Sequence, residues 1–443
     1  MALPLTSLIS QQYITLPSFT LDCGITLYDV PVAYKTWGTL NSTRDNVMVI
    51  CHAFTGSSDV EDWWGPLMGR GKAFDAARFF IFCGNVLGSP YGTASPVTVN
   101  PATGKRYGPE FPPTTVRDDV RLHKAALDEL GVRGVAVVIG GSMGGMAVLE
   151  WPLVMRDMGV HGEGGGYVKR IIPLATSARH SAWCISWGEA QRQSIYADPE
   201  YRDGYYFRGE GGGDLERQPK VGLAAARMAA LLTYRSRDSF ESRFGRRSGR
   251  SNLREELGVM TPPQSPKLET LEDALMVHND GHKKACEQSP QIFSAQSYLR
   301  YQGDKFTARF DANCYIHITR KLDTHDIARG RVTPSDSDSA LAEVLSTLPP
   351  ALVISIATDG LFTTSEQRIL AQHIPQSELV LIPSEDGHDG FLLEFERINE
   401  CVLNFLKSEF SEYYETDDEE VKGDFEIKKT SVFGEAEVDV AKW

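Results

Sequence analysis

The chain has 443 residues, of which 42% are hydrophobic and 23% are charged, and these are the proportions of a globular protein with a large core. Its net charge of −14 argues against nucleic acid or an anionic membrane surface as the main partner. We therefore expect one large domain with an insertion, or two ordinary domains, and neither a nucleic-acid nor a membrane partner.

The cysteines and the N-terminal segment favour a cytoplasmic protein. Seven cysteines are scattered along the chain without a CxxC pair, which is typical of reduced thiols. No apolar run approaches the roughly 18 residues of a membrane span. The first residues lack the charged and then apolar pattern of a secretory signal. We see no cluster of metal-ligand spacing and expect no metal.

Apolar runs alternate with helical patterns along much of the chain. The residues from about 13 to 37 predict antiparallel edge strands. The later strands are expected at Val47–Cys51, Phe79–Cys83, Val135–Ile139, Arg170–Ala175, Ala351–Ala357 and Glu378–Ile382, and the helices at Val116–Leu130, Met143–Met155 and Asn399–Phe410. Such βα units predict an α/β fold with a mainly parallel sheet and helices on both faces.

The alternation breaks between residues 176 and 348, which we interpret as a helical lid inserted into the core. The stretch Val221–Leu232 has a helical pattern, whereas Gly245–Asn252 and Thr261–Lys267 are polar and rich in Gly, Ser or Pro. We therefore expect a core of residues 1–175 and 349–410, a lid of residues 176–348 with a disordered excursion at about 236–290, and a disordered acidic tail at 411–443.

A serine motif follows the most apolar of these strands. Residues 140–145 read Gly-Gly-Ser-Met-Gly-Gly, between the run Val135–Ile139 and a helical stretch. In a strand–turn–helix setting, this pattern places Ser142 on a strained turn with its hydroxyl exposed above a helix N-terminus. Ser142 is thus a candidate nucleophile, although an ordinary serine in a glycine-rich turn is the alternative.

A serine hydroxyl needs a base and a residue that orients the base. Asp359 and His388 each follow a predicted strand, and the order Ser, Asp, His is that of the α/β-hydrolase fold. We predict that His388 takes the proton of Ser142 and that Asp359 fixes the His388 ring. Asp386 competes with Asp359 but lies only two residues from His388. His325 is the next candidate histidine, for which a structural role is the better interpretation.

An oxyanion site must accompany this triad. In this fold it combines the backbone N–H after the nucleophile with a second N–H from the loop after an early strand. The first donor is Met143, and the loop His52–Gly56 makes Phe54 the candidate for the second. A simple turn at the end of the strand is the alternative for Phe54.

Many ordered motifs resemble the homoserine O-acetyltransferase family, and a fungal member in particular. They are Tyr34–Asn41, His52–Gly56, Gly84–Gly88, Asn100–Gly104, Phe111–Pro112, Thr115–Val120, Gly141–Met146, Leu149–Trp151, Leu174–Ala178, Ser297–Leu299 and Phe310–Asn313. The resemblance covers most of residues 15–408, apart from the expected excursion.

The resemblance implies a homodimer and a two-step acetyl transfer, with acetyl-CoA as co-substrate and no bound cofactor. Ser142 would accept the acetyl group, and the hydroxyl of L-homoserine, deprotonated by His388, would then receive it. The family pattern Gly-Leu-x-x-Ala-Arg makes Arg227 the ligand of the substrate carboxylate, and Asp389 would hold the amino group. A guanidinium and a carboxylate suit an amino-acid zwitterion.

Other functions stay open at this point. Phe54 replaces a leucine common in relatives, and the loop Gly88–Pro96 differs from the bacterial form. One methylene contributes only about 1–3 kcal/mol of discrimination, so L-serine or a secondary-metabolite hydroxyl is an alternative acceptor. An esterase with the same triad is a third hypothesis, and a binding protein with an inactive triad is a fourth.

Overall fold

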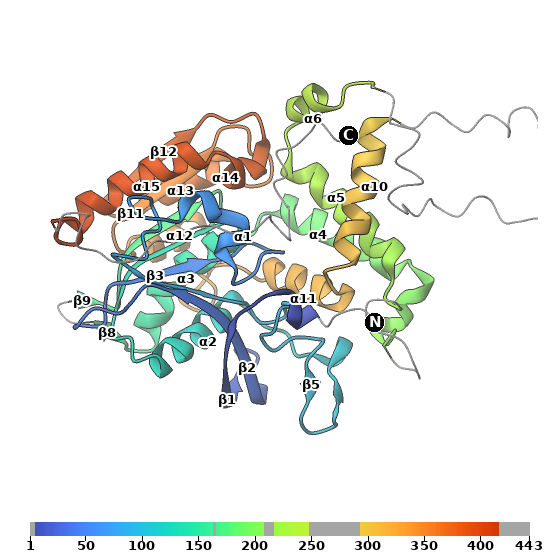
Figure 1. Ribbon diagram of the computed structural model, residues 1–443, viewed down its shortest axis with the longest axis horizontal. Helices are drawn as coiled ribbons and strands as arrows, with labels where there is room; N and C mark the ends of the chain where they lie inside the picture. Colours follow the sequence, from blue (N-terminus) through green and yellow to red (C-terminus); the bar gives the residue numbers. More distant parts are fainter. Residues whose placement is uncertain (1–4, 163–164, 208–216, 248–292, 416–443) are drawn as a thin grey trace, which may run out of the picture.

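An eight-stranded sheet forms the centre of the molecule (Figure 1). The computed structural model describes residues 5–162, 165–207, 217–247 and 293–415. The strands are β1 (Gln12–Thr20), β2 (Thr26–Trp37), β3 (Val47–Cys51), β4 (Phe80–Gly84), β7 (Val135–Gly141), β10 (Val168–Leu174), β11 (Ala351–Ile356) and β12 (Ser377–Ile382). Their order is β1-β2-β4-β3-β7-β10-β11-β12, parallel from β4 onwards, with β1 and β2 antiparallel. The predicted mainly parallel sheet is confirmed.

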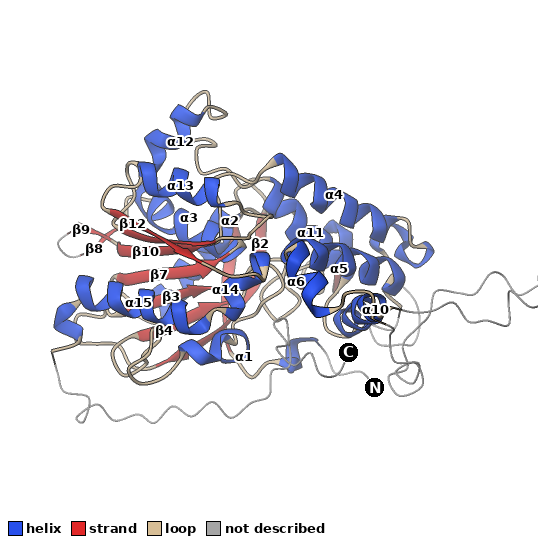
Figure 2. Cartoon of the chain, turned by 90° about the horizontal axis from the view of Figure 1, so that it is seen from above, coloured by secondary structure: helices blue, strands red, loops and turns tan. Residues whose placement is uncertain are grey.

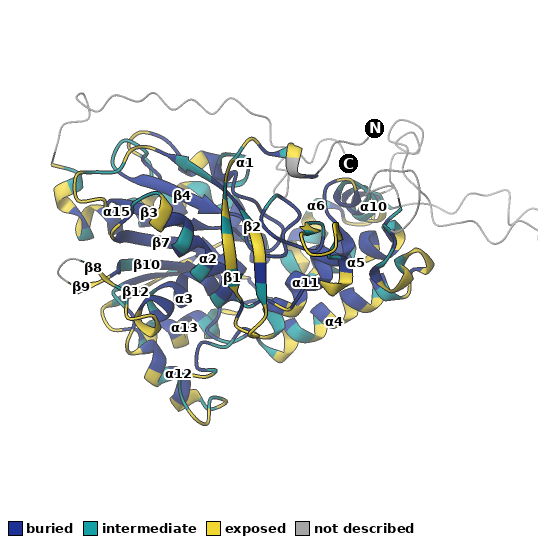
Figure 3. Ribbon diagram, turned by 90° about the horizontal axis from the view of Figure 1, so that it is seen from below, coloured by how far each residue is buried: buried dark blue, intermediate teal, exposed yellow. Residues whose placement is uncertain are grey.

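The central strands are buried on both faces, which explains their unbroken apolar sequences. In β3, Val47, Val49 and Cys51 pack in one hydrophobic cluster. Met48 and Ile50 point to the opposite face and belong to a second cluster. Successive side chains of a strand alternate between the faces, so a strand covered on both sides has no polar position. Figure 3 shows the same contrast between the buried central strands and the more exposed β1 and β2.

Helices cover each face of the sheet, as Figure 2 shows. Those on one face are α2 (Val116–Glu129), α3 (Met143–Asp157), α12 (Asp338–Leu345) and α13 (Thr364–His373), and those on the other are α1 (Val60–Trp64), α14 (Gly390–Leu393) and α15 (Phe395–Glu409). Helix α2 begins at a capping box in which Thr115 and Asp118 satisfy each other's backbone N–H groups. Two short strand pairs lie outside the main sheet, namely β5 (Val99–Asn100) with β6 (Lys105–Arg106) and β8 (His161–Gly162) with β9 (Gly165–Gly166).

A group of helices stands beside the sheet, where the predicted lid should be (Figures 1 and 2). Its members are α4 (Ala182–Tyr196), α5 (Lys220–Tyr234), α6 (Arg237–Arg243), α10 (Ser294–Thr307) and α11 (Ala312–Asp323). A third hydrophobic cluster joins this lid to the core, since Phe306, Phe310 and Tyr315 of the lid pack with Phe54 and Met143. The lid therefore rests directly on the predicted oxyanion residues.

The structure differs from the predicted boundaries in two places. Helix α12 falls within the predicted lid, but its apolar residues pack in the core cluster on the face of the sheet that α2 and α3 cover. Helix α6 begins inside the excursion expected at 236–290, because Ser236 caps it and Phe240 and Phe244 pack against Tyr298. The rest of the expected excursion, and residues 416–443 of the tail, lie outside the described residues.

Two further findings bear on the sequence-based expectations. Within the described ranges, no helix is both long and apolar enough to cross a membrane. Six cysteines fall in those ranges, and all six are free thiols.

Candidate active site

Ser142 lies on the sharp turn between β7 and α3. Its backbone angles are φ 58° and ψ −125°, a strained conformation for a residue with a side chain. Two hydrogen bonds hold the turn: Ser142 N–H donates to Leu174 O over 3.0 Å, and Thr176 Oγ1 donates to Ser142 O over 2.7 Å. The backbone is thus anchored from the neighbouring strand, and the side chain stands at the N-terminus of α3.

The glycines of the motif allow two backbones to meet under the serine. A Cβ atom at Gly140 would lie 2.7 Å from Cys51 O, and one at Gly144 would lie 2.1 Å from the same oxygen. Both distances are far below van der Waals contact, so side chains here would push α3 away from β3. The turn, and with it the position of Ser142, depends on this close approach.

Asp359 and His388 come together from the loops after β11 and β12. His388 Nδ1–H donates to Asp359 Oδ2 over 2.7 Å, and both side chains are buried. The other carboxylate oxygen of Asp359 accepts the N–H groups of Leu361 and Phe362 over 2.8 and 2.9 Å. Three donors therefore fix the carboxylate, and the carboxylate fixes the imidazole ring.

The competing acid and the competing histidine have other partners. Asp386 forms an ion pair with Arg235. His325 is buried in another part of the core, with Nε2 3.2 Å from the carbonyl of Ser177, and burial lowers its pKa to about 4. Its environment is that of a neutral structural histidine.

A small cavity brings most of the predicted site residues together. Its lining consists of Ala53, Phe54, Thr55, Ser142, Arg227, Tyr234, His388, Asp389, Phe391 and Leu392. Asp359 lies behind His388, and Met143 follows Ser142 at the first turn of α3. Since the first N–H groups of a helix have no partner within it, the Met143 N–H is oriented for an external acceptor.

Arg227 reaches this cavity from lid helix α5. Its side chain is only 3% exposed, and the guanidinium lies 4.9 Å from the ring centre of Phe306 and 5.7 Å from that of Tyr234. The Tyr234 ring lies 6.0 Å from that of His388. Aromatic faces stabilise a cation in a site with little water. The geometry thus supplies one buried positive charge beside the serine.

Arg235 is a residue of this region that sequence reasoning missed. It directly follows α5, is buried, and forms ion pairs with Asp389 over 2.7 Å and with Asp386 over 2.5 Å. The backbones also touch, because a Cβ atom on Gly387 would lie 2.6 Å from Ser236 N. The lid and the loop that carries His388 are therefore fastened to one another. No local pattern marks Arg235, whose partner Asp386 is 151 residues away.

Glu366 is a second residue near the site that the sequence analysis did not single out. It accepts the backbone N–H of Thr363 as part of the capping box of α13, and burial, together with the nearby negative charge of Asp359, raises the pKa of Glu366 to about 7. The spacing Thr363-x-x-Glu366 is itself a helix-start signal. It could have located the beginning of α13.

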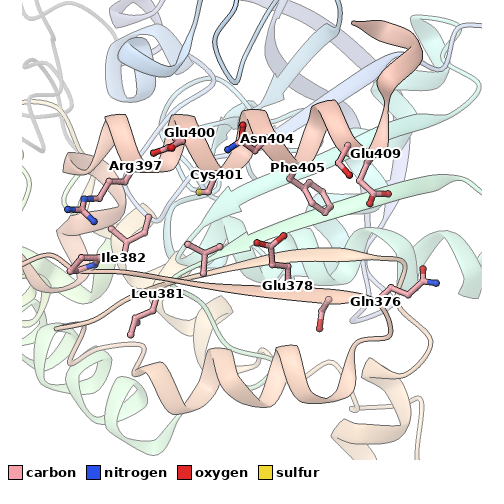
Figure 4. Close-up of a pocket in the computed structure, with 14 residues that line it drawn as sticks. Gln376, Glu378, Leu381, Ile382, Arg397, Glu400, Cys401, Asn404, Phe405 and Glu409 are labelled. Atoms are coloured by element: carbon pink, nitrogen blue, oxygen red, sulfur yellow. The ribbon is translucent and has the colours of Figure 1, made fainter. Parts of the chain in front are cut away.

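A wider hollow lies elsewhere, between the edge strand β12 and helix α15 (Figure 4). Charged side chains of both signs surround it, among them Glu378, Arg397 and Glu400. It contains neither the serine nor the histidine of the candidate site. We therefore assign it no part in the chemistry.

Comparisons with known proteins show the family to which the chain belongs. A family model described as the alpha/beta hydrolase fold matches residues 46–395. A homoserine O-acetyltransferase of Cryptococcus neoformans var. grubii is 56% identical over 99% of this chain and 97% of its own length. Those of Saccharomyces cerevisiae and Emericella nidulans are each 50% identical over 99% of this chain and 96% of their own. The chain belongs to the homoserine O-acetyltransferase family.

Solved structures with lower sequence identity to this chain show the same fold. A homoserine O-acetyltransferase from Bacillus anthracis matches with a TM-score of 0.70 at 23% identity, over 90% of this chain and 97% of that one. A mutant of the esterase E22 matches with a TM-score of 0.69 at 25% identity, over 90% and 99%. The fold thus serves both transferases and esterases, whereas the identities near 50% belong to the transferases.

Proposed function

We propose that this chain is an acyltransferase that moves the acetyl group of acetyl-CoA to the hydroxyl of L-homoserine. The observation that carries the proposal is the set of residues around one small cavity. A strained serine, a histidine bonded to a buried aspartate, a buried arginine and an aspartate all belong to it. The names of the relatives, at 46–56% identity, support the same substrate.

In the first half-reaction, Ser142 Oγ attacks the thioester carbonyl. The O–C bond forms, the carbonyl electron pair moves onto oxygen, and the serine proton passes to His388 Nε2. The N–H groups of Phe54 and Met143 stabilise the negative oxygen. The intermediate then collapses, the C–S bond breaks, and the proton leaves with the sulfur as free CoA. Asp359 stabilises the imidazolium that forms in between.

In the second half-reaction, His388 Nε2 removes the proton of the homoserine hydroxyl, whose oxygen attacks the acetyl carbonyl on Ser142. The tetrahedral intermediate collapses, the bond between Ser142 Oγ and the acetyl carbon breaks, and the proton on His388 passes to Ser142 Oγ, which restores the free enzyme. Arg227 binds the substrate carboxylate, and Asp389 binds the ammonium group. This chemistry requires neither a metal nor a resident cofactor, and acetyl-CoA enters as a co-substrate. The lid contributes by limiting the access of water, which would otherwise hydrolyse the acetyl-enzyme.

The assembly and the location are part of the proposal. Trp183 on α4, together with Val221 and Leu232 on α5, is at least half exposed, and such apolar side chains on lid helices suit a homodimer contact. Light scattering on the purified protein tests it, with a dimer mass expected and a monomer mass contradicting it. We also propose a cytoplasmic location, which a fluorescent fusion would test.

An acceptor panel tests the reaction. Purified protein is incubated with acetyl-CoA and with homoserine, serine, threonine or no acceptor, and free CoA, free acetate and the acetylated product are measured. The proposal expects CoA release that depends on homoserine, with O-acetylhomoserine in equal amount. Faster turnover with serine than with homoserine would show that serine is the preferred acceptor. Release of acetate as the main product would show an esterase, the function of the E22 neighbour.

A further inference from the structure

His52 is a buried histidine that the proposed mechanism does not use. It directly follows β3, is the first residue of the predicted oxyanion loop His52–Gly56, and is only 1% exposed. Its Nδ1 lies 2.8 Å from Ala53 O, and its Nε2 lies 3.1 Å from Val86 N. A carbonyl can only accept and a backbone N–H can only donate. The ring is therefore neutral, with the proton on Nδ1. Nε2 is unprotonated and accepts the N–H of Val86.

The Nδ1 contact acts on the peptide that carries the oxyanion donor. Ala53 O accepts the proton of His52 Nδ1 and also the N–H of Gly56, over 3.0 Å. The Ala53–Phe54 peptide is trans, so its N–H points away from its carbonyl oxygen. Two donors that fix the carbonyl of Ala53 therefore also fix the direction of the Phe54 N–H, and Phe54 lines the cavity beside Ser142.

The Nε2 contact joins the ring to a loop that is itself held by other hydrogen bonds. Next to Val86, Leu87 N–H donates to Asp119 Oδ1 over 2.8 Å, and Leu87 O accepts from Lys321 Nζ over 2.7 Å. Lys321 also forms a buried ion pair with Asp119 over 2.6 Å. This pair links lid helix α11 to core helix α2. Nε2 of His52 is thus bonded to the loop at the lid–core junction, and Nδ1 is bonded to the oxyanion loop.

We propose that His52 is a positioning residue for the oxyanion site. Its neutral Nδ1–H tautomer aligns the Phe54 N–H with the carbonyl oxygen that becomes negative when Ser142 attacks. The inference rests on the proposed function in one respect, namely that Phe54 is an oxyanion donor. Because the negative oxygen develops in both half-reactions, loss of the alignment should slow both and leave substrate binding unchanged.

Two variants separate the two ring contacts. The amide nitrogen of Asn occupies nearly the place of Nδ1, so His52→Asn keeps the donor to Ala53 O and loses the acceptor for Val86. The longer His52→Gln places its amide near Nε2, keeps an acceptor for Val86, and loses the donor. Both changes remove the ring, so any loss of packing is shared, and the difference between them reports the Ala53 contact.

The assay is the burst of p-nitrophenol released when the serine is acetylated by p-nitrophenyl acetate, together with steady-state turnover of acetyl-CoA and homoserine. Loss of an oxyanion donor lowers kcat by about 100- to 1000-fold, and a misaligned donor retains part of its effect. We therefore expect His52→Gln to slow both the burst and kcat by about 10- to 100-fold, with unchanged KM values. His52→Asn should retain most of the wild-type rates.

Equal burst rates for the wild type and His52→Gln would overturn the inference. So would a rise in KM alone, or a fall in thermal stability with unchanged rates in both variants. The burst does not involve homoserine, so a wild type with a burst but no acetylhomoserine would contradict the proposed acceptor and leave the role of His52 intact.

If His52→Gln does not fold, the wild type still provides a test. In protein labelled with ¹⁵N-histidine, the signal that is absent from His52→Asn identifies residue 52. The inference expects a neutral ring protonated at Nδ1 at pH 7. A doubly protonated ring, or a proton on Nε2, would contradict it.

Discussion

Arg235 offers a sharp prediction about what fastens the lid to the catalytic loop. The change Arg235→Met removes the guanidinium and keeps a chain of similar bulk. Asp389 is only 5% exposed, so its carboxylate would stay buried without the ion pair to Arg235. Removing one partner of a buried ion pair costs about 3–5 kcal/mol. The second partner, Asp386, has a side chain that is 33% exposed and can turn towards water. We therefore expect Arg235→Met to lower the free energy of unfolding by about 3 kcal/mol, the smaller value of this range.

Urea unfolding followed by circular dichroism measures this loss. Arg237→Met is a matched control two residues away, because Arg237 and its partner Asp238 have side chains that are 83% and 85% exposed. Exposed pairs contribute about 0–1 kcal/mol, so the control should change the free energy of unfolding little. The double variant Arg235→Met with Asp389→Asn should recover part of the loss, since the buried charge is then gone.

The kinetic consequence can be separated from stability. Arg235 orients Asp389, the proposed ligand of the ammonium group, so Arg235→Met should raise KM for homoserine in the molecules that remain folded. The rate of serine acetylation should change less. Equal effects of the Arg235 and Arg237 variants on unfolding, or full additivity in the double variant, would refute this reasoning.

Three other predictions follow from the site. Asp359→Asn should lower kcat by about 10³- to 10⁴-fold, because an amide cannot hold the required tautomer of His388, and a loss below tenfold would contradict the triad. Arg227→Met should raise KM for homoserine and leave the acetylation burst unchanged, and slowing of the burst alone would contradict carboxylate binding. His317 is a buried histidine of helix α11, and burial lowers its pKa to about 3. Below pH 6.5 the unfolded chain therefore binds a proton that the folded chain does not bind, so stability falls as the pH falls. The stability advantage of the wild type over His317→Gln should therefore shrink with a slope that approaches about 1.4 kcal/mol per pH unit between about pH 5.5 and 4, whereas a constant difference would contradict the lowered pKa of His317.

The sequence predicts the parts of the site whose residues are neighbours in the chain or directly follow a strand. The strand, turn and helix around Ser142 are neighbours in the chain, so spacing alone predicts β7, the turn and α3. Asp359 and His388 each follow a predicted strand, and parallel strands bring their carboxyl ends to one edge. That is why three residues distant in sequence could be expected in one place.

The lid could be predicted only in outline, because its contacts are between residues far apart in the chain. The pairing of Arg235 with Asp386 and Asp389 depends on how α5 meets the loop after β12. The start of α6 depends on the packing of Phe240 and Phe244 against Tyr298, which is more distant in the sequence. The hydrogen bond of His52 Nε2 likewise requires the loop at Val86. None of these arrangements has a periodic signal.

The most direct measurement of the central claim is the mass of the enzyme after mixing with acetyl-CoA alone. The account predicts that the peptide containing Ser142 gains the mass of one acetyl group, that this label disappears on addition of L-homoserine as O-acetylhomoserine forms, and that Ser142→Ala gains no label. An acetyl group on another residue, or turnover of homoserine by Ser142→Ala, would contradict it.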